Sequence, residues 1–471
     1  MSSKDVPPLQ ELAMQTLLRD ENLIISSLGK LPPVFFLELF KQACERGLGN
    51  VLKKMVASWP FPRLPLGAMK KRNFFQIQEY ILEEIDRVLI QKVRPREYKL
   101  EVLDLRSVGQ SCSDVWSGPI DNWLPQTSSE AKEGGKQPLK VAVNLYLRND
   151  PANKLFFLSQ WAKKRKGLLE VYCYELQIWL PSLSDCKYFL ECMNLHHIEV
   201  LGLYCLRKPA FLLNLNSYLG HMTNLRKLSL SNLHEESLVS PEERKHIISG
   251  FASQLLNMEC LQKLHLDNTS FFQGHLHQLL GSLKTPLDDL AVTNCQVSDS
   301  DWYHLSKLPC VSQLKQLSLE NIRLVYLSPE PLRVLLVKSA STLVSLSLED
   351  CHMKARYLYA ILPALSNCLQ LTTFNFYGNQ VSKNALKKLL RHTASLKHLS
   401  MELYPIPKDC YEDNGTLHME YTGILCDELM DTLKAIRKPG RVYFGADRCH
   451  ECNIRYIYNK TMMCKCRRIA D

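Results

Sequence analysis

The sequence predicts an α/β solenoid of leucine-rich repeats: a horseshoe with parallel strands on its concave face, helices on its convex face and a helical cap at its amino-terminal end. The pattern Leu-x-x-Leu-x-Leu, with other apolar residues at some positions, recurs eight times between residues 198 and 403. Successive copies begin 25 to 29 residues apart, except for one interval of 36, and such spacing is typical of leucine-rich repeats. The second half of each repeat has helical spacing, as at Leu276, Leu279 and Leu280. Because no repeat can bury its apolar face alone, we expect the repeats to stack.

The composition is that of a folded protein. The chain has 471 residues, of which 46% are hydrophobic, so it can bury a large core. No apolar run approaches the roughly 18 residues that a membrane span needs, and the first eleven residues do not resemble a signal peptide. The 17 cysteines are scattered, many at positions typical of core, which favours a reducing compartment. We therefore expect an intracellular protein, in the cytoplasm, the nucleus or both.

The positive charge is partly clustered. The net charge is +10, and part of the excess lies at residues 70–72 and 163–166. Such clusters bind nucleic acid or an import receptor in some proteins, but a charge run is more often a solvated surface. No aromatic residues interleave with them, so we do not expect a nucleic-acid partner. Because the chain lacks an apolar run of membrane-span length, we do not expect a membrane partner either. Residues 163–166 are compatible with nuclear import.

Residues 8–93 contain no copy of the repeat and are predicted to form a bundle of helices. In the first helix, one stripe contains Leu9, Leu12, Ala13 and Leu17. This stripe suits a helix that caps the first repeat. The string Pro8-Leu9-x-x-x-Ala13-x-x-x-Leu17 also resembles the box through which substrate receptors bind the elongin B–elongin C adaptor, with Ala13 where cysteine is more usual. Both interpretations of the helix stay open.

A second short box follows the first. Leu31, Pro32 and Val34 belong to the string Leu31-Pro32-Pro33-Val34, which resembles the Leu-Pro-containing box that brings such receptors into contact with a cullin. Many amphipathic helices match the first box by chance, so that box alone is weak support. The order and spacing of the two boxes add support for the adaptor interpretation. Residues 1–95 are thus predicted to form a helical cap with elongin-binding and cullin-binding boxes.

Residues 96–197 are predicted to contain irregular repeats. Leu100-x-x-Leu103-x-Leu105 fits the strand pattern well, and Leu168-x-x-Val171-x-Cys173 fits it poorly. Residues 126–137 are polar, contain glycine and have no periodicity, so we expect a flexible loop.

Regular repeats are predicted over residues 198–405, and the long interval places an insertion at 231–245. In each strand the leucines point to one side and the intervening residues to the other. The intervening residues would line the concave wall on which solenoids usually bind partners. We select these candidate contacts for a protein substrate: Lys263, His265, Asp267, Gln316, Glu320, Asn375, Tyr377 and His398. For each, the alternative is a strand residue that merely faces solvent.

Two further sets of residues are assigned to the core. Small side chains three residues after the last apolar strand position can turn inward to the backbone, and they are Cys295, Cys351 and Asn379. Strings of the form Leu-x-x-Leu-Leu begin at Leu276, Leu332 and Leu386. Exposed strings of this form dock as helices into nuclear-receptor grooves. Here each falls where a repeat helix must bury leucine, so we favour a core role.

Residues 406–471 are predicted to form a carboxyl-terminal cap with a cysteine-rich tail. Cys449-x-x-Cys452 and Cys464-x-Cys466 are separated by eleven residues, a loop length that suits a zinc knuckle. The second pair is tighter than usual, and His450 is an alternative ligand. Reduced thiols without metal are the other interpretation, whereas a redox pair is not favoured because no thioredoxin-like βαβ pattern precedes it. Apart from this candidate structural zinc, we expect no cofactor.

The chain contains no motif that predicts catalysis. A phosphate-binding glycine loop, a nucleophile elbow and the kinase motifs are all missing from the sequence. The histidines are dispersed. We therefore do not expect an enzyme.

Specific strings are dispersed over nearly the whole chain, among them Leu17-Leu18-Arg19-Asp20-Glu21 and Phe376-Tyr377-Gly378-Asn379. The others lie at residues 55–61, 64–67, 93–96, 100–106, 115–118, 327–332, 370–374, 411–413 and 415–418. With these strings the chain resembles the PRAME family (preferentially expressed antigen in melanoma and its relatives).

The resemblance implies a leucine-rich-repeat horseshoe, in agreement with the repeat pattern. It also implies a substrate-recognition subunit of a cullin-2-based ubiquitin ligase, recruited through elongin and linked to negative regulation of transcription, differentiation and apoptosis and to promotion of proliferation. The alternative is a repeat scaffold or transcriptional corepressor that recruits no ligase. The resemblance names no substrate, because family members diverge most in what they bind.

Overall fold

Two compact units divide the chain. The computed structural model describes residues 9–68, 74–91, 98–106, 137–148, 161–165, 167–179, 187, 189–191, 193–204, 210–234, 239–449, 451–461 and 466. The first unit comprises Met1–Leu145, Ala152–Glu175 and Glu191–Asn194, and the second comprises Tyr146–Pro151, Leu176–Leu190 and Leu195–Asp471. The predicted loop at 126–137 lies outside the described residues, except for Gln137.

The first unit begins with helices, as predicted. They are α1 (Leu9–Leu17), α2 (Glu21–Ser27), α3 (Pro33–Arg46), α4 (Gly49–Ala57) and α5 (Phe74–Ile90). Their core includes Trp59, against which Phe36 and Phe40 of α3 pack edge-on with ring centroids 5.6 and 4.9 Å away. The strands are β1 (Arg63–Leu64) and β2 (Val102–Asp104), with β3 (Leu139–Leu147) and β4 (Leu169–Ile178) beginning in this unit. The two irregular copies of the repeat therefore both contribute strands, the poorly fitting one included.

The second unit is a stack of repeats built on parallel strands. They are β5 (Val200–Tyr204), β6 (Lys227–Ser231), β7 (Lys263–Asp267), β8 (Asp289–Thr293), β9 (Gln316–Glu320), β10 (Ser345–Ser347), β11 (Thr373–Asn375), β12 (Met401–Pro405) and β13 (Arg441–Arg448). Each of these strands pairs in parallel with the next, and β14 (Arg455–Ile457) closes the series antiparallel to β13. The predicted leucine-rich-repeat solenoid is confirmed.

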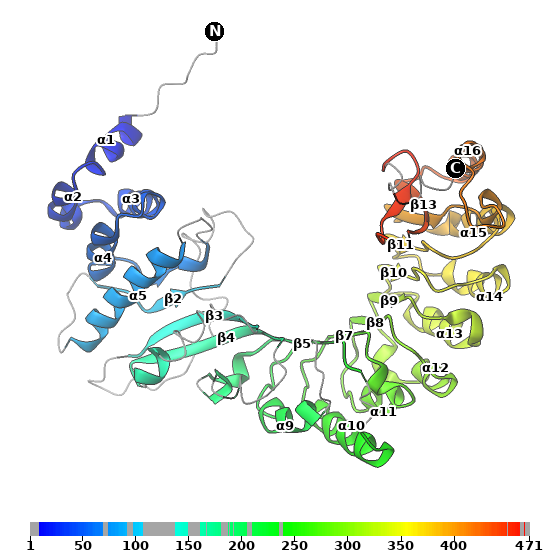
Figure 1. Ribbon diagram of the computed structural model, residues 1–471, viewed down its shortest axis with the longest axis horizontal. Helices are drawn as coiled ribbons and strands as arrows, with labels where there is room; N and C mark the ends of the chain where they lie inside the picture. Colours follow the sequence, from blue (N-terminus) through cyan, green and yellow to red (C-terminus); the bar gives the residue numbers. More distant parts are fainter. Residues whose placement is uncertain are drawn as a thin grey trace, which may run out of the picture. The chain divides into compact units, whose positions relative to one another are not determined.

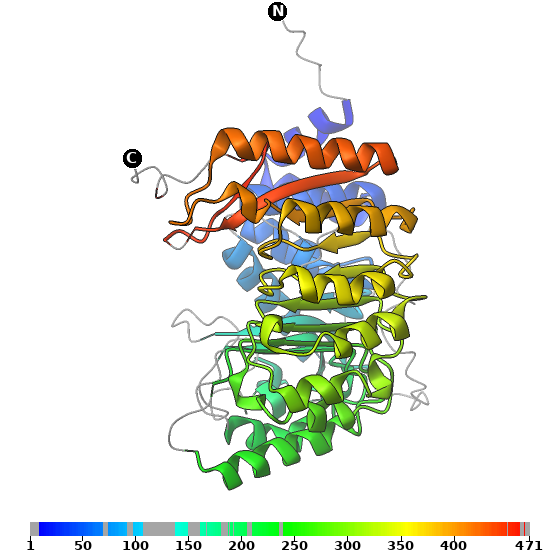
Figure 2. The same ribbon diagram turned by 90° about the vertical axis from the view of Figure 1, so that its right-hand side faces the viewer.

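Helices cover the outer side of this unit. They are α9 (Ala210–Leu219), α10 (Pro241–Leu255), α11 (Leu276–Gly281), α12 (Asp299–Leu305), α13 (Glu330–Ser339), α14 (Ala355–Leu365), α15 (Lys383–His392) and α16 (Met419–Ile436). Within this unit the strands from β5 onward lie on the inner side and the helices on the outer side in Figure 1, and Figure 2 shows the helices from α10 to α16 stacked in chain order. None of the helices in the described part of the chain has the length and apolar character that crossing a bilayer requires.

The leucines of the repeat pattern form the core between strands and helices. Leu228, Leu264 and Leu317 are fully buried from the strand side. The helix leucines of the three Leu-x-x-Leu-Leu strings are buried from the other side, and they are Leu276, Leu279, Leu280, Leu332, Leu335, Leu336, Leu386, Leu389 and Leu390. Their assignment to the core is confirmed.

Inward side chains satisfy the backbone where the chain leaves each strand. Asn379 is buried, and its Nδ2 donates to the carbonyl oxygen of Leu348 at 2.7 Å. Cys295 takes the corresponding place in an earlier repeat, with its Sγ 3.7 Å from the carbonyl oxygen of Leu266. Cys351 is also fully buried. The prediction that these three residues turn inward is confirmed.

A second set of turn residues, which we call the asparagine ladder, was not anticipated from the sequence. Residues with positive φ of 52 to 68° follow the strand segments of successive repeats, and they are Asn232, Asn268, Asn294, Asn321, Asp350 and Gly378. Asn268 Nδ2 donates to Asn232 Oδ1 at 2.8 Å, and Asn321 Nδ2 donates to Asn294 Oδ1 at 2.9 Å. Asparagine, aspartate and glycine tolerate this conformation better than other residues. Their recurrence just after each strand was the signal available in the sequence.

The last repeat strand lies three residues later than predicted. The pattern Leu396-x-x-Leu399-x-Met401 placed His398 on the concave wall, but β12 begins only at Met401. Met401 aligns with Thr373 of β11, and His398 lies in the segment before the strand. The predicted wall position of His398 is therefore wrong.

A buried charge explains this shift. Glu402 aligns with Phe374, so it faces the core, where its side chain is 0% exposed. The carboxylate pairs with Arg437, the residue directly after α16, and accepts a hydrogen bond from the Tyr404 hydroxyl at 2.7 Å. Because the sequence pattern expects an apolar residue at this position, it matched the preceding leucines instead.

Candidate functional site

The predicted elongin box lies on a helix that buries a different face. The box comprises Pro8, Leu9, Leu12, Ala13 and Leu17. Leu12 is 40% exposed and Ala13 is exposed, whereas Met14 and Leu18 are buried. Leu17 is half-buried. Leu12 and Ala13, in the middle of the stripe read from the sequence, are therefore not on the face that packs α1 into the bundle.

The predicted cullin box lies at the start of α3. Leu31 is half-buried, and Pro32 is exposed and is the residue directly before the helix. Val34 belongs to the first turn of α3. Pro8, at the start of the elongin box, lies outside the part of the chain that the structure describes.

Three of the predicted substrate contacts lie together on β7. Lys263, His265 and Asp267 alternate with the buried leucines, as the sequence predicts. Lys263 is exposed, and His265 Nε2 lies 2.9 Å from Asp289 Oδ2 on β8. This part of the wall therefore presents a cation, an imidazole and carboxylates in neighbouring repeats.

Asp267 is engaged by its neighbours rather than left for a partner. Its carboxylate accepts hydrogen bonds from Ser231 Oγ at 2.8 Å, Thr293 Oγ1 at 2.7 Å and Asn294 Nδ2 at 2.7 Å. Burial alone would raise the pKa of Asp267, but these donors outweigh burial and hold the pKa below its usual range. The carboxylate therefore ties three repeats together.

The wall residues of the later repeats are engaged to different degrees by internal hydrogen bonds. Gln316 is exposed on β9, whereas Glu320 accepts a hydrogen bond from Ser318 Oγ at 2.8 Å. Asn375 Nδ2 donates to Glu349 Oε2 at 2.8 Å. Of this group, Gln316 keeps the most accessible side chain.

The hairpin of β13 and β14, which we call the carboxyl-terminal hairpin, covers the end of the wall. Arg455 lies over the ring of Tyr377 at 5.0 Å from its centroid, and Tyr377 is only 6% exposed. Arg455 also pairs with Glu349 and Asp350, each at 2.9 Å, and Arg448 contacts the same two carboxylates. The predicted contact Tyr377 is therefore covered by this hairpin.

A cleft opens beside the hairpin at the carboxyl ends of the strands. Its volume is about 720 Å³, and asparagines of the ladder form part of its lining. The charged residues in the lining are Glu320, Glu349, Asp350, Asp447 and Arg448. Two of these carboxylates, Glu349 and Asp350, are already paired with Arg448 and Arg455. Sequence reasoning missed this cleft, because its two sides are about a hundred residues apart in the chain.

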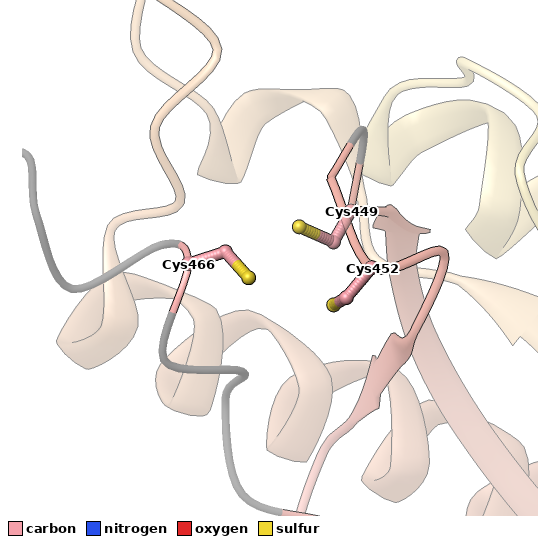
Figure 3. A group of neighbouring side chains, drawn as sticks. All are labelled: Cys449, Cys452 and Cys466. Carbon is pink, nitrogen blue, oxygen red and sulfur yellow. The ribbon is translucent and has the colours of Figure 1, made fainter.

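Three of the predicted metal ligands converge at the tip of the carboxyl-terminal hairpin. Cys449 directly follows β13, Cys452 lies in the turn, and Cys466 reaches them from later in the chain. Their Sγ atoms all lie within 4.8 Å of one another, around one common space (Figure 3). Cys464 and His450, the other predicted ligands, are not among the described residues.

Comparisons with known proteins cover nearly the whole chain. Residues 6–116 match the model of the PRAME N-terminal domain, and residues 139–467 match that of the PRAME C-terminal domain. PRAME family member 12 from Homo sapiens is 42% identical over 467 residues, which are 98% of this chain and 96% of that protein. Preferentially expressed antigen in melanoma-like protein 1 from Mus musculus is 44% identical, over 88% of this chain and 92% of that protein.

A solved structure is also similar in part. The crystal structure of an internalin from Listeria monocytogenes covers 56% of this chain and 80% of that chain. The sequence identity is 13% and the TM-score is 0.27.

Proposed function

The chain belongs to the PRAME family, and we propose that it is a substrate-recognition subunit of a cullin-2-based ubiquitin ligase. In this proposal α1 binds the elongin B–elongin C adaptor, and the start of α3 contacts cullin-2. The inner strand face of the second unit holds a protein substrate. The chain itself performs no chemistry, because its role is to bring the substrate to the ligase.

The orientation of α1 carries the proposal. A helix that served only as a cap would turn its apolar stripe inward, but Met14 and Leu18 make the inward contacts here. Leu12 and Ala13 remain on the exposed face. An exposed leucine on such a helix is suited to helix-in-groove recognition by a partner.

The substrate side of the proposal rests on the accessible part of the inner face. The side chains of Lys263 and Gln316 are exposed, and that of His265 is half-exposed. In this proposal a protein bound there is ubiquitinated and lost. The bound protein would be a regulator, and its loss would repress transcription, differentiation and apoptosis and promote proliferation. Solenoids present an extended surface of this kind to protein partners.

Direct binding of purified elongin B–elongin C tests the proposal. Leu12→Glu places a charge on the proposed contact, so we expect it to weaken binding by about tenfold or more, or about 1.4 kcal/mol. Leu23→Glu is the matched control, because Leu23 is 47% exposed on the neighbouring helix α2 and lies outside the box. Isothermal titration calorimetry measures both. Equal affinity of the wild type and Leu12→Glu, or no binding by either, would overturn the proposal.

A scaffold or transcriptional corepressor without ligase recruitment is the second candidate. Ala13 favours it, because a smaller side chain than the usual cysteine fills less of an adaptor pocket. In that case Leu12→Glu would leave the biological effect of the protein intact, while substitutions on the inner face would abolish it.

A further inference from the structure

Three thiols meet at the tip of the carboxyl-terminal hairpin without any role in the proposed ligase function. We propose that Cys449, Cys452 and Cys466 bind a structural zinc ion that fixes this hairpin against the repeats. The inference rests on the geometry of the cap and is independent of elongin or cullin binding.

The hairpin turn places two of the ligands side by side. The Cys449 N–H donates to the carbonyl oxygen of Ile454 at 3.0 Å, and the Asn453 N–H donates to that of Cys449 at 2.9 Å. Asn453, directly after Cys452, has a φ of 57°, which folds the chain back at this point. The turn therefore holds the Cys-x-x-Cys pair in a closed loop to which Cys466 is added from outside.

The distances suit a thiolate-bound metal. Zinc binds cysteine sulfur at about 2.3 Å in a tetrahedral arrangement, so two ligating sulfurs lie about 3.8 Å apart. The Sγ atoms already lie within 4.8 Å of one another, and small side-chain rotations would bring them to the sulfur–sulfur separation of a zinc site. Thiolates select zinc, copper(I) or iron–sulfur clusters over hard cations. A Cys-x-x-Cys pair with a third cysteine is most typical of a structural zinc site, whose fourth position takes one further donor.

The location of the site gives the metal a structural consequence. Arg448 directly precedes Cys449, and Arg455 opens β14 on the other side of the turn. Both guanidinium groups pair with Glu349 and Asp350 of an earlier repeat. A metal that closes the turn therefore also holds these ion pairs, because its binding free energy adds to the folding free energy of the hairpin.

Metal content of the purified full-length chain tests the site. We expect inductively coupled plasma mass spectrometry to find one zinc per wild-type chain and almost none in Cys452→Ser/Cys466→Ser. Cys260→Ser is the control, since Cys260 is a half-buried thiol of the repeats outside the cluster, and it should keep its zinc. Replacement by Co²⁺ should give the visible absorption bands of a tetrahedral thiolate site.

A second measurement keeps the test decisive if the double variant misfolds. Cys466 is exposed, so Cys466→Ser alone should fold. A chelator should lower the melting temperature of the wild type and increase hydrogen exchange in residues 441–457, without either effect in Cys466→Ser. Zinc-free wild-type protein, bound iron or copper instead of zinc, or a Cys449–Cys452 disulfide found by mass spectrometry would each overturn the proposal.

Discussion

Glu349 joins the repeats to the carboxyl-terminal hairpin through charge. Burial alone would raise its pKa, but the Asn375 amide and the guanidinium groups of Arg455 and Arg448 outweigh burial and lower it. A carboxyl group with a lower pKa in the folded chain stabilises the fold fully above its unfolded-state pKa of about 4.3. That stabilisation is lost as the pH falls through the folded-state pKa.

Glu349→Gln should therefore destabilise the repeats in a pH-dependent way. We expect a loss of about 1–2 kcal/mol in the free energy of unfolding at pH 7, because two guanidinium groups lose one carboxylate partner. The difference from the wild type should shrink well below pH 4, as measured by urea unfolding with circular dichroism. Arg333→Gln, which removes an exposed ion pair with Glu330, is the control and should change little at either pH. A deficit that stays constant into acid would contradict this account.

Asn321 tests the asparagine ladder at a single backbone position. Its φ of 52° disfavours β-branched residues, so Asn321→Val should cost about 1–2 kcal/mol. Asn321→Gly should stay within about 0.5 kcal/mol of the wild type, since glycine adopts this conformation without strain. Thermal unfolding of both variants measures the difference. Equal destabilisation by valine and glycine would show that the lost side-chain hydrogen bond, and not the backbone, matters.

At the scale of elements, β12 is the strand whose position the leucine pattern did not predict correctly. Strand and helix positions in the earlier repeats follow from apolar spacing alone, because each leucine position is buried as expected. In the last repeat a core position is occupied by Glu402, whose partner Arg437 lies 35 residues later. Spacing cannot reveal a buried charge that is neutralised by a distant residue. His398 was misplaced for this reason.

The pair Glu402 and Arg437 gives a prediction for this element. Arg437→Ala leaves a fully buried carboxylate without its cation, so we expect a loss of about 3–4 kcal/mol. The double variant Glu402→Leu/Arg437→Met should recover most of it, because an apolar pair of similar size suits the core. Chemical unfolding of the single and double variants measures the coupling. A double variant no more stable than Arg437→Ala would contradict the assigned register of β12.

The amino-terminal helix shows a similar limit. The sequence predicted α1 and the stripe at Leu9, Leu12, Ala13 and Leu17, but not which face would be buried. That choice depends on contacts with the following helices, where Met14 and Leu18 pack. Likewise, the burial of Tyr377 depends on Arg455, which no local pattern links to it.

At the scale of the whole molecule, the predictable parts are those with many local signals. The repeat period predicted the solenoid, and dispersed strings predicted the family. The spacing of Cys449 and Cys452 predicted a cluster that the fold brings together with Cys466. The cleft and the hairpin that covers the end of the wall are produced by contacts between residues about a hundred positions apart, and the sequence contains no local pattern that reveals such contacts.

Recruitment of a cullin-2 ligase through elongin C is the basis of the proposed function, and a pull-down measures it. The wild-type chain and a Leu9→Ala/Leu12→Ala variant would be captured beside each other and probed for elongin C and cullin-2, with circular dichroism to establish that both are folded. The account predicts both partners with the wild type and neither with the variant. Absence of elongin C and cullin-2 from the wild-type capture, or their undiminished presence with the folded variant, would contradict it.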